Sequence, residues 1–185
     1  AIVLGIWTNK KRFEELMPQK AVTGDKVDGL KADRLLGDRY LRFLVEELKP
    51  FIDSTYRTLP GRADTFVMGS SMGGLMSAYA ISEYPEVFGG AGCVSTHWPL
   101  DDGIVIDYLE KHLPAPANHM FYFDFGTATL DAEYEPYQRR VDTLMRSSGY
   151  TEGVKWITRK YLGAEHSEKA WRQRVDVPLK FLLGR

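Results

Sequence analysis

The sequence predicts an α/β fold in which helices cover both faces of a mostly parallel sheet, as a three-layer α/β/α sandwich. Three observations predict it. Five short apolar runs rich in β-branched or aromatic residues alternate with stretches of helical periodicity. Alternation of this kind produces right-handed crossovers between parallel strands. The chain has 185 residues, 44% hydrophobic and 26% charged, which is ordinary for one globular domain. We therefore treat residues 1–185 as a single domain.

The first expected strand covers residues 1–7, which form a continuous apolar run. Because a buried parallel strand seldom opens a protein, we expect further residues upstream of it. A polar stretch, 8–36, is predicted to be a long loop. A helix over 38–49 follows, with Leu41, Leu44, Val45 and Leu48 at helical spacing. Pro50 either ends this helix or begins a second turn.

Strands and helices then alternate to the end of the chain. The expected strands are 64–70, 89–95, 119–125 and 154–161. The expected helices are 72–83, 104–112, 134–148 and one from about 167 to the end, interrupted at Pro178. In such sheets the reactive groups lie in loops beyond the carboxyl ends of the strands. Residues just after 70, 95, 125 and 161 are therefore the first candidates for a site.

Charge and composition exclude several classes of function. Lys and Arg number 24 against 25 Asp and Glu, so no basic field for nucleic acid or a membrane surface is present. Cys93 is the single cysteine, which excludes an intrachain disulfide and a thiolate zinc cluster within one chain. No apolar run approaches the roughly 18 residues of a membrane span. Metalloprotease, EF-hand and dinucleotide patterns are absent, so we expect no metal and no organic cofactor.

The strand at 64–70 leads into Gly69-Ser70-Ser71-Met72-Gly73-Gly74, which fits G-x-S-x-G with Ser71 at its centre. In this motif a serine sits on a tight strand-to-helix turn, and we expect a Cβ at either flanking glycine to clash. The Met72 amide would then lie at a helix N-terminus, where it can donate to an oxyanion. The alternative is a Gly/Ser-rich turn that only connects strand to helix. A phosphate loop is excluded, because Leu75 stands where Lys is needed.

Four histidines compete as the base that a serine nucleophile needs. His166 lies in a loop after the last expected strand, and His97 follows the strand at 89–95. We favour His166 and keep His97 as the alternative. His112, within a helix, and His119, at the start of a strand, are expected to be structural or solvated.

The orienting acid should follow the strand at 119–125. Asp131 is the favoured candidate, and its alternative role is to cap the next helix. Asp124 is the second candidate, although its alternation with Phe123 and Phe125 points to burial elsewhere. The resulting order along the chain is Ser71, Asp131 and His166, which is the order of the α/β-hydrolases.

The chain resembles the putative-esterase branch of the α/β-hydrolases, which includes enterochelin esterases, S-formylglutathione hydrolases, feruloyl esterases and mycolyltransferases. The stretches that carry the resemblance are Asn9 to Pro18, Glu46 to Arg57, Gly69 to Leu75, Pro85 to Gly89 and Gly163 to Trp171. It implies Ser71 as nucleophile and His166 as base, and it supports Asp131 as acid. Family members have three strands before the one expected at 1–7, and the loop after the third supplies a second oxyanion amide. Those strands have no counterpart in this sequence.

We expect a serine carboxylesterase that hydrolyses a small or aryl ester through an acyl-enzyme on Ser71, with Met72 N–H in the oxyanion hole. The expected partner is a small-molecule ester, without nucleic acid or membrane. Ser70 and Trp98 are the substrate-binding candidates, with the core as the alternative place for Trp98. Trp171 is expected in the core. Two other functions stay open: a non-catalytic interaction domain of the same fold, and an acyltransferase using the same three residues.

Overall fold

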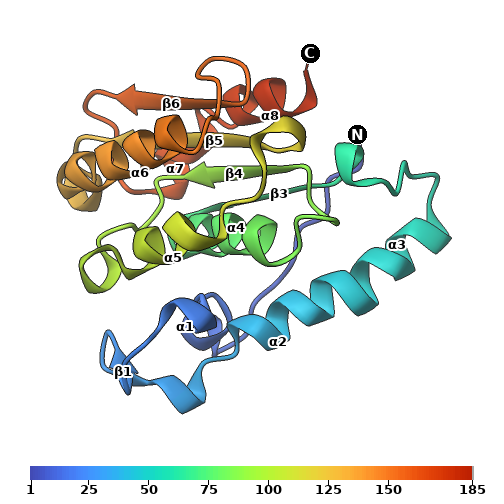
Figure 1. Cartoon of the computed structure of the whole chain (residues 1–185), viewed down its shortest axis with the longest axis horizontal. Helices are drawn as coiled ribbons and strands as arrows, with labels where there is room; N and C mark the ends of the chain where they lie inside the picture. Colours follow the sequence, from blue (N-terminus) through green and yellow to red (C-terminus); the bar gives the residue numbers. More distant parts are fainter. Residues whose placement is uncertain (185) are drawn as a thin grey trace.

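The computed structural model describes residues 1–184 and contains a four-stranded parallel sheet (Figure 1). Its strands are β3 (Phe66–Ser70), β4 (Gly90–Val94), β5 (Met120–Gly126) and β6 (Trp156–Tyr161), side by side in that order. All three pairings are parallel. Four of the five expected strands are thus confirmed, each within two residues of its expected ends.

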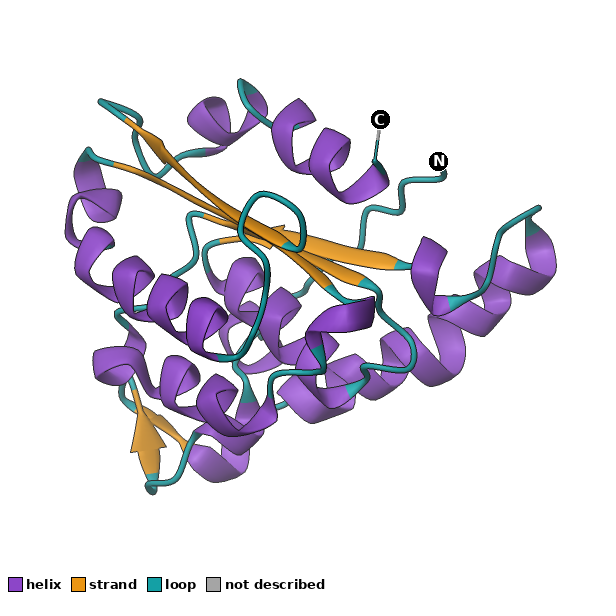
Figure 2. Ribbon diagram, turned by 45° about the horizontal axis from the view of Figure 1, so that its top comes forward, coloured by secondary structure: helices purple, strands orange, loops and turns teal. Residues whose placement is uncertain are grey.

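Helices cover both faces of this sheet (Figure 2). On one face lie α4 (Met72–Glu83), α5 (Ile104–His112) and α6 (Glu135–Ser147), with α4 packed on β3 and β4. On the other lie α7 (Glu168–Arg172) and α8 (Asp176–Leu183), with α8 packed on β4 and β5. The three-layer α/β/α sandwich is confirmed.

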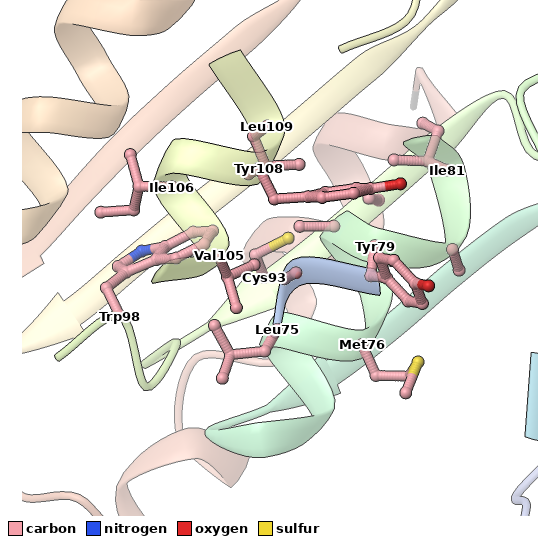
Figure 3. Packing of buried hydrophobic residues seen from close by; sticks show 14 of the residues in the cluster. Leu75, Met76, Tyr79, Ile81, Cys93, Trp98, Val105, Ile106, Tyr108 and Leu109 are labelled. Carbon is pink, nitrogen blue, oxygen red and sulfur yellow. The ribbon is translucent and has the colours of Figure 1, made fainter. Parts of the chain in front are cut away.

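The main core lies between the sheet, α4 and α5 (Figure 3). Leu75 and Ile81 of α4 are fully buried, and so is Phe121 of β5. Small residues in α4, among them Ala78 and Ala80, are also fully buried and let this helix lie close to the sheet. Burial of this apolar surface is the main favourable term in folding.

The expected strand at 1–7 is wrong, because these residues form no regular secondary structure. Val3 and Trp7 are 81% and 94% exposed. A strand exists only where a neighbouring strand satisfies its backbone groups. Within residues 1–184, β3 pairs on one side only, with β4, and no strand lies beside residues 1–7.

The expected loop at 8–36 contains several short elements. They are α1 (Arg12–Glu15), the 3₁₀ turns η1 (Gln19–Ala21) and η2 (Ala32–Arg34), and the hairpin of β1 (Lys26–Val27) with β2 (Leu30–Lys31). Met17 and Val27 are buried and anchor this region to the core. Side-chain anchoring therefore orders a segment whose polarity predicts a loop.

The helix expected at 38–49 runs further, through α2 (Gly37–Arg42), a π-helical stretch η3 (Phe43–Leu48) and α3 (Lys49–Thr55). Lys49 N–H donates to the Leu44 carbonyl, one residue beyond the α-helical spacing. Pro50 lies in the first turn of α3, where its missing N–H is tolerated. Of the two alternatives for Pro50, the structure shows the second, because the helix continues through it.

The C-terminal helix is interrupted at residues 173–175, before Pro178 and not at it. Pro178 is the third residue of α8, a position where proline is compatible with a helix. The remaining 3₁₀ turns are η4 (Arg62–Asp64), η5 (Leu100–Gly103), η6 (Pro116–Asn118) and η7 (Thr129–Glu133). None of the helices in residues 1–184 has the length and apolar character of a membrane-spanning helix.

Truncating an aromatic residue tests which segments belong to the core. We expect Phe121→Ala to lower the free energy of unfolding by about 3–5 kcal/mol, because it opens a cavity in the sheet. Trp7→Ala should change it by less than about 0.5 kcal/mol, since that side chain is exposed. Denaturant unfolding of both variants measures the difference. Equal losses would mean that residues 1–7 pack as a strand in solution.

Candidate active site

Ser71 occupies the turn between β3 and α4 in a strained backbone conformation. Its φ and ψ are 58° and −120°, a region that residues with a Cβ rarely adopt. Its N–H donates to the Val94 carbonyl at 2.9 Å, which ties the turn to the end of β4. The serine is only half-buried, so its hydroxyl stands at the end of the sheet and not inside the core.

Two glycines let the turn close. A Cβ on Gly69 would lie 2.6 Å from the Gly73 oxygen and 2.7 Å from its carbonyl carbon. A Cβ on Gly74 would lie 2.4 Å from Thr96 Oγ1. Gly73 itself has open space where a Cβ would be. The expected clash is therefore present at Gly69 and absent at Gly73.

The Met72 amide is the first of α4, so it has no carbonyl one helical turn earlier to bond. It lies at the positive end of a twelve-residue helix, directly after Ser71. An oxyanion formed beside Ser71 would meet this N–H.

His166 and Asp131 meet after β6 and β5. The distance from His166 Nδ1 to Asp131 Oδ1 is 2.5 Å. The imidazole makes edge contacts with the rings of Tyr134 and Trp171, at centroid distances of 5.6 and 4.9 Å. These contacts and the Thr129 hydroxyl, which accepts from His166 N–H at 2.8 Å, fix the loop that carries the histidine.

Asp131 is buried and accepts two further hydrogen bonds. Gly126 N–H and the Ser95 hydroxyl both donate to its Oδ2, each at 2.6 Å. Burial acts to raise the pKa of this carboxyl, but hydrogen bonds from His166, Ser95 and Gly126 outweigh burial and hold its pKa below the usual value. Asp131 is therefore an ionised acceptor at neutral pH.

The alternative roles considered for these carboxylates are resolved by their contacts. The residue that caps α6 is Tyr134, without a side-chain bond, so Asp131 does not cap that helix. Asp124 is buried and pairs with Arg174, with Oδ1 and Nη2 3.0 Å apart. Asp124 has no hydrogen bond to a histidine within residues 1–184.

His97 lies beside the site but has a different partner. Its ring atom Nδ1 is 2.7 Å from the Tyr134 hydroxyl, and its backbone N–H donates to the Ser71 carbonyl at 3.3 Å. Burial, and then the electrostatic interaction with His166, lower the pKa of His97. Among the described residues no carboxylate hydrogen-bonds His97, so it lacks the orienting acid that a catalytic base needs.

The other two histidines hydrogen-bond backbone oxygens, and His112 is exposed. His112 Nδ1 is 2.8 Å from the Tyr108 carbonyl oxygen. His119 is buried, with its two ring nitrogens each 2.8 Å from a backbone oxygen, of Ala115 and Pro85. Cys93 is fully buried in β4, and burial raises the pKa of its thiol, so it is unreactive.

A cavity of about 380 Å³ lies beside the turn that carries Ser71. Ser70 lines it, together with apolar residues such as Val94, Trp171 and Val175 and charged residues such as Glu168 and Arg174. Trp171 is half-buried, lines this cavity and contacts His166, so the expectation that it belongs to the core is wrong.

Trp98 is not at the surface of the site, and the expectation that it binds substrate is wrong. It is 1% exposed, beside Val105 and Ile106 in Figure 3. Its Nε1–H donates to Gln138 Oε1 at 2.9 Å. Its position soon after a strand end suggested a pocket, but the chain turns inward there.

The structure also brings in residues that the sequence analysis missed, namely Ser95, Tyr134 and Arg174. Ser95 directly follows β4, and that place at a strand end is the only sequence signal that pointed to it. Within residues 1–184, no group of three or more His, Cys, Asp and Glu side chains could hold a metal ion. The arrangement offers a serine on a strained turn, a helix N-terminus and a histidine held by a buried carboxylate.

Comparison with known proteins finds one matching family model and a relative in Bacillus subtilis. The model of a family described as "Putative esterase" matches residues 35–180. The uncharacterized protein YbbA of Bacillus subtilis (strain 168) is 23% identical over 157 residues, which are 81% of this chain and 61% of YbbA. The chain thus spans less than two thirds of that relative's length.

Two solved structures have the same fold. An IroE-like serine hydrolase from Shewanella oneidensis superposes with a TM-score of 0.70 at 17% identity, over 94% of this chain and 57% of that one. The enterobactin esterase FES from Shigella flexneri has a TM-score of 0.68 at 19% identity, over 80% of this chain and 39% of its own. These similarities establish the α/β-hydrolase fold.

Gly69 and Gly73 form a matched pair for testing the turn. Gly69→Ala should lower the free energy of unfolding by about 1–3 kcal/mol, because its Cβ would meet the backbone of Gly73. Gly73→Ala should be neutral or slightly stabilising, since its Cβ would have free space within a helix. Denaturant unfolding compares the two. Equal effects would contradict the tight contact at Gly69.

The lowered pKa of Asp131 predicts a pH dependence of stability. A carboxyl whose pKa is lower in the folded than in the unfolded state stabilises the protein above the unfolded value of 3.8. That contribution is lost as the pH falls through the folded value. We expect the wild type to be more stable than Asp131→Asn at pH 6, with an advantage that shrinks below pH 3.8. An advantage independent of pH, measured by denaturant unfolding, would contradict the assignment.

Proposed function

Since the chain belongs to the Putative esterase family, we propose that it is a serine carboxylesterase that forms an acyl-enzyme on Ser71. The observation that carries the proposal is the hydrogen bond from His166 to the buried Asp131, at the same edge of the sheet as Ser71. A serine hydroxyl is a weak nucleophile unless a base removes its proton, and a base is effective when an acid orients it. The chain supplies each of these groups from a separate loop.

In the proposed reaction, His166 Nε2 takes the proton of the Ser71 hydroxyl as the oxygen attacks the ester carbonyl. Asp131 accepts the Nδ1 hydrogen bond and stabilises the imidazolium. The Met72 N–H donates to the oxyanion. The imidazolium then gives its proton to the departing alcohol. Water, activated by His166, attacks the acyl-enzyme and releases the acid and free Ser71.

The proposed substrate is a small or aryl carboxylic ester. The cavity beside Ser70 is lined by apolar side chains, including Trp171, which contacts the His166 ring, and by four charged residues. An acyl or aryl group placed there would lie beside Ser70, the residue that precedes the nucleophile. The similar protein from Shigella flexneri is named as an enterobactin esterase, which agrees with an ester as the bond that is cleaved.

Covalent labelling with a fluorophosphonate, read by intact mass, tests the nucleophile. We expect one adduct on the wild type and none on Ser71→Ala. The rate of p-nitrophenyl acetate hydrolysis should fall by at least about 10³-fold in Ser71→Ala and in His166→Gln, because the residues act as a unit. Ser82→Ala, elsewhere on α4, should label and hydrolyse like the wild type, since its hydroxyl donates to the Ala78 carbonyl of the same helix.

A folded wild-type chain that neither labels nor hydrolyses esters would refute the esterase proposal and favour a non-catalytic domain. Labelling of Ser71→Ala would assign the nucleophile elsewhere. Product analysis with an added alcohol distinguishes hydrolysis from acyl transfer. The acid alone is expected, and an ester of the added alcohol as the main product would make the chain an acyltransferase.

A further inference from the structure

A buried chain of polar residues continues from Asp131 into the protein. The Ser95 hydroxyl lies between Asp131 and Arg174, 2.6 Å from Asp131 Oδ2 and 2.8 Å from Arg174 Nη2. Arg174 also donates to both oxygens of Asp124, at 3.0 and 3.1 Å. All four side chains are at most 5% exposed. The groups come from the loop after β4, from β5, from η7 and from the segment between α7 and α8.

The direction of the Ser95 proton follows from the chemistry of its neighbours. A guanidinium has donors and no acceptor, so Arg174 Nη2 must donate to Ser95 Oγ. The single hydroxyl proton of Ser95 is thereby left for Asp131, whose carboxylate can only accept. A hydroxyl that accepts from a cation is also a stronger donor. Arg174 and the Asp131 carboxylate are thus linked by hydrogen bonds through the Ser95 hydroxyl.

The backbone of Ser95 is held by Asp124, the carboxylate that also pairs with Arg174. Its φ is 39°, in the left-handed region, and its N–H donates to Asp124 Oδ1 at 3.0 Å. Asp124 Oδ2 accepts from the Tyr122 hydroxyl at 2.8 Å. The guanidinium of Arg174 lies over the Tyr161 ring, 4.6 Å from its centroid. Strain of this kind persists only where the surroundings over-determine the conformation.

We propose that Ser95 is a positioning residue for the reaction, held by Asp124 and Arg174, and that it fixes the orientation and the charge of Asp131 and, through Asp131, the imidazole of His166. This inference rests on the proposed function. None of the three residues touches the reacting atoms, and Ser95 acts by a hydrogen bond to the acid alone.

Removal of the Ser95 hydroxyl should change how His166 titrates. When His166 is neutral, Asp131 accepts hydrogen bonds from His166 Nδ1–H, from Ser95 and from Gly126 N–H. When His166 is an imidazolium, its positive charge stabilises the Asp131 carboxylate further. Loss of the Ser95 hydroxyl therefore destabilises the state with neutral His166 more than the state with the imidazolium. The imidazole should then take up its proton at higher pH. The other titratable groups around the pair are His97 and Tyr134, and substitution at Ser95 leaves both in place.

Two variants test this inference together. Ser95→Ala and Ser95→Gly both remove the hydroxyl, but glycine relieves the left-handed backbone at this position and alanine does not. Their stabilities should therefore differ, while their effects on catalysis should agree. We expect kcat for p-nitrophenyl acetate to fall roughly tenfold in both, with KM within about twofold. In the pH profile of kcat/KM, the acid limb should move to higher pH by roughly half a unit.

Ser77→Ala is the matched control. Ser77 is as buried as Ser95, but its hydroxyl donates to the Gly73 carbonyl within α4. It should leave the position of the acid limb unchanged. A loss of folded protein in any variant lowers the rate at all pH values and does not move the limb. An acid limb that stays at the wild-type pH in both Ser95 variants would overturn the inference.

A second readout does not need catalysis. NMR titration of ¹³C-labelled imidazoles follows His166 directly, with its signal assigned by its absence in His166→Gln. In both Ser95 variants the signal should titrate at higher pH than in the wild type. If the wild type is inactive but this shift appears, the esterase proposal fails and the positioning role of Ser95 stands. If folded variants show the wild-type midpoint, the positioning role fails whatever the activity.

Discussion

The parallel register of β3 to β6 is the constraint on which the site depends. Ser70 at the end of β3 is level with Val94 of β4, and Val94 is level with Asp124 of β5, so the carboxyl ends of neighbouring strands meet at one edge. The loop after each strand therefore begins at this carboxyl edge of the sheet. Ser70 and Trp171, which are 101 positions apart, line one cavity there. They come together because a parallel crossover returns every strand to the same starting edge.

The strained backbone conformations and the buried charges of the protein are concentrated at that edge of the sheet. Ser71, Ser95 and Thr129 all have positive φ angles, and all three lie in connections that follow strand ends, Thr129 at the start of η7. Asp131 and Asp124 are buried carboxylates, which are unfavourable unless they are satisfied. Hydrogen bonds from Gly126 N–H, Ser95, Tyr122 and Arg174 satisfy them. The apolar packing of α4, α5 and the sheet supplies the stability that holds these unfavourable conformations in place.

Sequence reasoning succeeded where local pattern decides the outcome. Four strands and the helices after them follow from apolar runs and periodicity, and α4 begins and ends at the expected residues. Sequence reasoning failed where the structure of a segment depends on the elements packed beside it. Residues 1–7 have the composition of a strand, but no strand lies beside them within the described chain. Trp98 lies in the core, which was its alternative place, and Trp171 lies beside His166 and not in the core. The direction of a loop after a strand end is set by packing and not by residue type.

By itself the sequence determined the α/β fold, the turn at Ser71 and the pairing of His166 with Asp131 as the preferred hypothesis. Glycine spacing and strand ends are local features, so they can be read along the chain. Only the tertiary structure decided that Asp124 pairs with Arg174, that His97 faces Tyr134, and that Ser95 joins Arg174 to Asp131. Each of these contacts joins residues at least 36 positions apart. The partner of a buried polar group is whichever group the packed elements bring within hydrogen-bond distance, and no local pattern contains that distance.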